Sequence, residues 1–152
     1  MADFHKNLEN AVKALEANKF PQALQIAQQL KEDPESILNE TYNLVYYVIA
    51  VATFRQAVGA GNTDIKTIDK CISALEKSIS IKPDHADSNM MMGEMYLVRA
   101  EQPGEESRHS YLAAKTWFEK ASALGDPWPA EFCRPQLDLI NTHLQEIKTS
   151  HT

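Results

Sequence analysis

The sequence predicts an all-α fold, and three observations support this prediction. The chain has 152 residues, about the length of one domain, and 43% of them are hydrophobic. Only 5 Gly and 7 Pro are present, which favours helices joined by short connections over a β architecture with many turns. Apolar residues recur at helical spacings of three and four along most of the chain. We therefore expect helices packed around a continuous core.

The first 34 residues predict two helices. The first carries an apolar stripe and ends near Asn18-Lys19; the stripe comprises Phe4, Leu8, Ala11, Val12 and Leu15. The second helix begins with Pro21 in its first turn, where the missing N–H costs no hydrogen bond, and stops before Pro34.

A third helix is expected from about Glu35 to Val58, with apolar residues on every face. A helix of this kind must be covered on several sides by its neighbours. Its most apolar run, Leu44 to Phe54, is about half the length that a membrane span requires. We therefore predict a buried core helix and no membrane span.

A glycine-containing loop and two further helices follow. Thr63 or Asp64 is the expected N-cap of a helix from Asp64 to Ile81, after a loop in which Gly supplies a positive φ. The next helix begins after Lys82-Pro83-Asp84 and contains Gly93. A helical Gly costs about 1 kcal/mol relative to Ala. We therefore expect another backbone to approach closely at Gly93.

The remaining residues predict two more helices. The first runs from about Ser107 to Leu124, with Gly125 as its C′ residue and Asp126-Pro127 preventing its continuation. The last segment has a narrow apolar stripe that indicates a capping helix, which Pro135 either starts or kinks. This stripe comprises Leu137, Ile140, Leu144 and Ile147.

The central and later segments carry the spacings of a known repeat family. One series resembles the second and first helices of consecutive tetratricopeptide repeats: Cys71, Leu75, Ser78, Pro83, Asn89, Met92, Gly93 and Tyr96. A later series reproduces A-x-x-W-x-x-x-A-[AS]-x-x-G, the second-helix signature of the SEL-one-like repeat: Ala114, Trp117, Ala121 and Gly125. The resemblance implies a right-handed α-solenoid of about three antiparallel helix pairs plus a C-terminal capping helix. It implies a single domain with repeats at 1–34, 35–83 and 84–126, and the cap at 127–152.

Several function classes are disfavoured by composition. The formal charge of −6 opposes binding to nucleic acid. Cys71 and Cys133 form no C-x-x-C pair and are expected to be buried thiols in the reducing cytoplasm. The amphipathic N-terminus does not resemble a signal peptide. No catalytic motif is present, so we expect neither an enzyme nor a cofactor. His85 and the methionines Met90, Met91, Met92 and Met95 are attributed to packing and not to a metal site.

The repeat resemblance implies a concave groove lined by the first helix of each pair. Its transferred lining positions are Val45, Val48, Ala52, Arg55 and Gln56 in repeat two, and Asp87, Met90, Glu94, Leu97 and Val98 in repeat three. Leu8 and Leu15 join them from repeat one. Such a groove favours a helical or extended segment with apolar anchors and basic residues. Alternatively, the protein's own terminal helix fills the groove and these residues are core.

Three functions remain open. The first is a non-catalytic protein–protein interaction module, an adaptor or assembly factor. The second is a cytosolic chaperone that shields an apolar client, since small acidic three-repeat proteins with an extra terminal helix resemble the chaperones of bacterial secretion systems. The third is a small-molecule-binding helical bundle, with a pocket lined by Tyr42, Tyr46, Tyr47 and Cys71. A homodimer is possible in each case.

Overall fold

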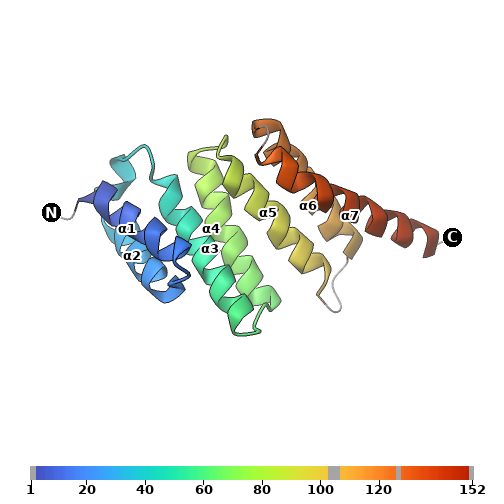
Figure 1. Ribbon diagram of the computed structural model, residues 1–152, viewed down its shortest axis with the longest axis horizontal. Helices are drawn as coiled ribbons and strands as arrows, with labels where there is room; N and C mark the ends of the chain where they lie inside the picture. The colour runs from blue at the N-terminus through green and yellow to red at the C-terminus, as the bar shows by residue number, and fades with distance from the viewer. Residues whose placement is uncertain (1–2, 103–106, 126–127, 151–152) are drawn as a thin grey trace. The chain divides into compact units, whose positions relative to one another are not determined.

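The computed structural model describes residues 3–102, 107–125 and 128–150, with the side chains of the last helix described to residue 148. The chain divides into two compact units, residues 1–83 and 84–152, which we treat separately. The division after Pro83 coincides with the boundary predicted between repeats two and three. Whether the units act as a single domain stays a prediction. In Figure 1 the first unit runs from blue to green and the second from yellow-green to red.

The first unit contains four α-helices, each packed against the next in sequence: α1 (Phe4–Glu16), α2 (Phe20–Glu32), α3 (Asn43–Gly59) and α4 (Ile65–Ile81). The side chain of Asp3 caps α1 by accepting from the backbone N–H groups of His5 and Lys6. Asn18 turns the chain toward α2 with a φ of 61°. The N–H of Lys19 then donates a hydrogen bond to the carbonyl of Ala14 at 2.8 Å. Both helices therefore lie where the sequence predicted them.

The predicted start of the third helix is wrong by eight residues. Residues Ser36–Leu38 form a short 3₁₀ helix, η1, and α3 begins only at Asn43. Side chains hold the intervening backbone: Asp33 Oδ1 accepts from the N–H of Glu35 at 3.0 Å, and Asn39 Nδ2 donates to the carbonyl of Ser36 at 3.1 Å. Such local hydrogen bonds compete with the helix for the backbone groups.

Helix α4 begins as predicted. Asp64 is its N-cap, with Oδ1 accepting from the N–H of Thr67 at 2.8 Å. Three apolar side chains of the helix, Ile68, Ile72 and Leu75, are buried. The loop before it uses Gly61 at a φ of 70°, a value that favours glycine.

The second unit contains α5 (Ala86–Ala100), α6 (Ser107–Leu124) and α7 (Ala130–Ser150), with α6 packed against both of the others. Its core is a cluster of eight buried residues: Met90, Ala100, Tyr111, Ala114, Phe118, Ala121, Cys133 and Ile140. The stripe predicted for the last helix is confirmed, because Ile140 belongs to this cluster and Leu137, Leu144 and Ile147 pack against it. Pro135 lies inside α7 and does not start it.

The close approach predicted at Gly93 is present, but its partner is a side chain. A Cβ at this position would lie 2.8 Å from three ring carbons of Phe118. The expectation of a neighbouring backbone was therefore wrong. The ring of Phe118 is fully buried, whereas Trp117, which the repeat signature singled out, is half-buried with the Lys120 ammonium 4.5 Å from its ring centroid.

Gly125 also permits a close contact and does not adopt a left-handed conformation. A Cβ there would collide with the carbonyl oxygen of Trp128 and lie 2.7 Å from Cδ of Pro129. The predicted stop at Asp126-Pro127 and most of the loop between α5 and α6 fall outside the described residues. Both cysteines are buried and free, as predicted. Among the described helices, none is long and apolar enough to cross a membrane.

Candidate functional site

The groove residues predicted on α3 divide into two groups. Val45, Val48 and Ala52 have no exposed surface, so they are core residues and do not line an open groove in this structure. Arg55 and Gln56, near the end of the helix, are exposed. Because α3 is apolar on all sides and packs against both α2 and α4, its composition does not indicate which face remains open.

The groove residues predicted on α5 are partly covered by α7 and by Trp128, which precedes it. Met90 is 7% exposed and shares its core cluster with Cys133 and Ile140 of α7. Asp87 accepts a hydrogen bond from the indole Nε1–H of Trp128 at 3.3 Å.

The remaining predicted residues of α5 are half-buried: Glu94, Leu97 and Val98. Leu97 packs against the core cluster. Burial raises the pKa of Cys133, and the nearby charge of Glu94 raises it further, so this carboxylate lies close to α7. Within this unit, much of the predicted surface therefore faces the chain's own C-terminal helix.

The first unit contains an apolar depression between the first helices of its two pairs, α1 and α3. Three apolar side chains line it: Leu8 and Val12, one turn apart on α1, and Leu44 at the start of α3. The depression has a volume of about 410 Å³, and the rest of its lining is His5, Glu9, Lys13, Glu16 and Thr41. We call this surface the α1–α3 groove.

Charged side chains form one edge of the α1–α3 groove. Lys13 Nζ lies 2.8 Å from Glu9 Oε1, and both side chains are more than half exposed. The hydrogen bond and charge of Lys13 lower the pKa of Glu9, and Glu9 raises the pKa of Lys13 in the same way. An exposed pair of this kind adds little to stability. Together with Glu16, it gives this edge one net negative charge.

A polar group also lies in the wall of the groove. The hydroxyl of Thr41 is buried and has no hydrogen-bond partner within the described residues. A buried hydroxyl without a partner is costly. Thr41 therefore offers a hydrogen bond that a segment in the groove would complete.

The sequence indicated part of this surface. Leu8 was among the transferred groove positions, and Val12 belonged to the apolar stripe of the first helix. Leu44 was missed because the transferred register chose Val45, and one residue corresponds to about 100° around a helix. No pattern within α3 distinguishes these two neighbours. The contact that does so is with α1, some 30 residues earlier in the chain.

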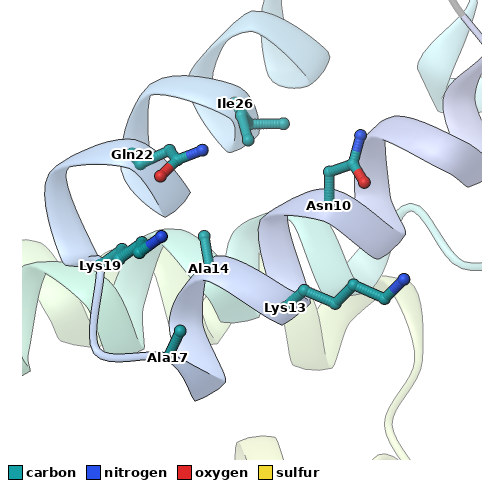
Figure 2. A pocket seen from close by; sticks show the side chains of 7 residues that line it. All are labelled: Asn10, Lys13, Ala14, Ala17, Lys19, Gln22 and Ile26. Carbon is teal, nitrogen blue, oxygen red and sulfur yellow. The ribbon is translucent and has the colours of Figure 1, made fainter.

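A second depression lies between α1 and α2 and has a different character. Figure 2 shows Asn10 and Ala14 of α1 facing Gln22 and Ile26 of α2, with Lys19 at the connection. Most of its lining is polar, so it does not suit an apolar anchor.

The residues predicted for a small-molecule pocket do not line any of these depressions. Tyr42 and Cys71 are buried, and the hydroxyls of Tyr42 and Tyr46 lie 3.1 Å apart. Burial and this hydrogen bond raise the pKa of Tyr42 to about 12. Within the described residues, no group of three or more His, Cys, Asp or Glu is arranged to hold a metal ion.

The seven α-helices of the described residues pack in sequential order within each unit, which confirms the predicted all-α fold of consecutive helix pairs. Among solved structures, the chain is similar to SycD, the type III secretion translocator chaperone of Yersinia enterocolitica. The TM-score is 0.60 and the identity 16%, with 97% of this chain and 84% of the SycD chain covered. At this identity the likeness shows the fold. No protein-family model and no curated protein matches the chain.

Proposed function

We propose that the protein is a chaperone that holds an apolar segment of a client protein in the α1–α3 groove. The observation that carries this proposal is the groove itself, where Leu8, Val12 and Leu44 meet from the first helices of two successive pairs. The fold shared with a translocator chaperone supports it, and favours this role over that of an adaptor.

The lining residues contribute to binding in two ways, by burial of apolar surface and by a hydrogen bond. Leu8, Val12 and Leu44 bury apolar anchors of the client, which is the main source of affinity. The hydroxyl of Thr41 gains the partner that it lacks when a backbone group of the client passes it. We expect the bound segment to be extended or to form a few helical turns, because both forms bind in apolar grooves.

The proposed client carries basic residues beside its apolar anchors. The formal charge of −6 favours such a partner over an acidic one. Asp87 and Glu94 remain proposed contacts on the second unit. Both side chains are half-buried, so only their exposed atoms would touch a client. The role needs no cofactor and no catalytic residue, and two buried thiols suit the cytoplasm.

The proposal is tested with labelled peptides and matched variants. The probe is a fluorescein-labelled peptide whose leucines are spaced by serine and glutamine, and its binding is measured by fluorescence anisotropy. We expect Val12→Asp and Leu44→Asp each to weaken binding at least about tenfold, because a carboxylate then lies among the apolar anchors. Leu139→Asp places the same charge on an exposed leucine of α7 and should leave binding unchanged.

Two results would contradict the proposal. One is a wild-type protein that binds no leucine peptide at all. The other is equal loss of binding in Leu44→Asp and Leu139→Asp, which would show that added negative charge, and not the groove, governs affinity. Circular dichroism of each variant verifies that the helices are retained.

A further inference from the structure

A third depression adjoins the α1–α3 groove at the start of α1. His5 lines both depressions, so the two surfaces meet at this side chain. Its carboxylates are Asp3, Asp33 and Glu35, and apolar surface is supplied by Phe4 and by Leu38, which is 82% exposed. We call this surface the acidic end of the groove.

Among the residues that the structure describes, the carboxylates at the acidic end have no cationic partner. Asp3 and Asp33 each use one oxygen, Oδ1, to accept from backbone N–H groups of the turns that they cap. Within the described residues, no ion pair involves Asp3, Asp33 or Glu35. Three negative charges thus gather around one depression without a compensating Lys or Arg in its lining.

A buried hydroxyl supplies an independent sign of a ligand. Ser36 lines the same depression and is 1% exposed, and its Oγ has no hydrogen-bond partner among the described residues. Native proteins rarely leave such a group unpaired, because a buried hydroxyl without a partner costs stability. Its position beside three carboxylates favours a ligand that donates several hydrogen bonds and carries positive charge.

We propose that the acidic end binds a basic side chain, best an arginine, placed next to the apolar anchors of the same client segment. A guanidinium has five donors in a planar fork, enough for carboxylates on two sides and for the oxygen of Ser36. Leu38 and Phe4 cover the aliphatic part of the side chain. This inference rests on the proposed function, because the client backbone must first lie in the α1–α3 groove.

The test compares two peptides that differ only in charge. Each is the leucine probe with a residue added at both ends, arginine in one peptide and citrulline, its neutral isostere, in the other. We expect the wild-type protein to bind the arginine peptide about tenfold more tightly. The double variant Asp33→Asn/Glu35→Gln should reduce this ratio to about one. The substitution Asp33→Asn removes the charge and keeps a side-chain oxygen that can accept from the N–H of residue 35, so the turn before η1 is retained.

A matched control removes the same charge elsewhere. Glu32→Gln/Glu40→Gln changes two exposed carboxylates close by in the chain that do not line the depression, and should keep the tenfold ratio. If both peptides bind the wild type equally and Leu44→Asp abolishes binding, binding in the α1–α3 groove is supported and the proposed role of the acidic end is overturned. If neither peptide binds, the proposed function is overturned, and so is the proposed role of the acidic end. If both double variants reduce the ratio of arginine-peptide to citrulline-peptide affinity equally, overall charge explains the preference for arginine. The proposed role of the acidic end is then also overturned.

Discussion

The contact between Gly93 and Phe118 predicts that replacing this helical glycine with alanine will not stabilise the protein. Replacing a glycine inside a helix with alanine ordinarily stabilises it by about 1 kcal/mol. In Gly93→Ala, however, the new methyl group would lie 2.8 Å from three carbons of the Phe118 ring. That ring is fully buried in the core of the second unit, so it has little room to move.

The magnitude follows from two opposing effects. Overpacking a well-filled core costs about 1–3 kcal/mol, and the gain in helix propensity offsets about 1 kcal/mol of it. We therefore expect Gly93→Ala to change the free energy of unfolding by between about 0 and 2 kcal/mol in the destabilising direction. In a Phe118→Leu background the clash is relieved, and the same substitution should stabilise by up to about 1 kcal/mol. The two positions are then coupled by about 1–3 kcal/mol.

Tryptophan fluorescence during urea denaturation measures this directly. The chain has two tryptophans, Trp117 and Trp128, and both belong to the second unit, so the signal reports the unit that contains the contact. The free energies of unfolding of the four proteins in the double-mutant cycle are compared, and their m-values should agree. Stabilisation by Gly93→Ala in the wild-type background, or the same effect in both backgrounds, would refute the packing described for α5 and α6.

Three further predictions concern the chain outside this contact. Because Asn18 has a φ of 61°, Asn18→Ala should lower the free energy of unfolding by about 1 kcal/mol and Asn18→Gly should not, as chemical denaturation would show. The hydrogen bond from Thr67 lowers the pKa of Asp64, so its charge stabilises the fold above the unfolded pKa, and this contribution is lost as pH falls through the lowered folded value. The difference in melting temperature between wild type and Asp64→Asn should therefore shrink from pH 7 to pH 3; a constant difference would contradict this assignment. Burial raises the pKa of Cys71 to about 11 and also raises that of Cys133, so a thiol reagent at pH 8 should label neither before unfolding, and rapid native labelling would be inconsistent with their burial.

Local signals in the sequence were sufficient to place most helices. Pro21 and Asp64 mark helix starts because a ring without an N–H and a short carboxylate each suit the first turn. The start of α3 was misplaced because the periodicity of apolar residues does not register the side-chain hydrogen bonds of Asp33 and Asn39. These bonds depend on the conformation of a few residues and leave no periodic trace.

The candidate site was less predictable because it depends on contacts between distant residues. Val45 was chosen over Leu44 by analogy with a repeat register, and only the position of α1 shows which of the two is accessible. On α5, Asp87 and Met90 occupy positions that a groove could use, but Trp128 and α7 partly cover them. Amphipathic patterns reveal that a face is apolar, not what packs on it.

Hydrogen exchange measured with and without the leucine–arginine peptide tests the central claim, that clients bind in the α1–α3 groove. At saturating peptide, amide exchange should slow most across α1 and from Thr41 through the first turn of α3, and any slowing in α5 should be smaller and confined to the part near Asp87 and Glu94. Protection confined to α5 and α7, or no protection in α1, would place the binding surface elsewhere and contradict the account.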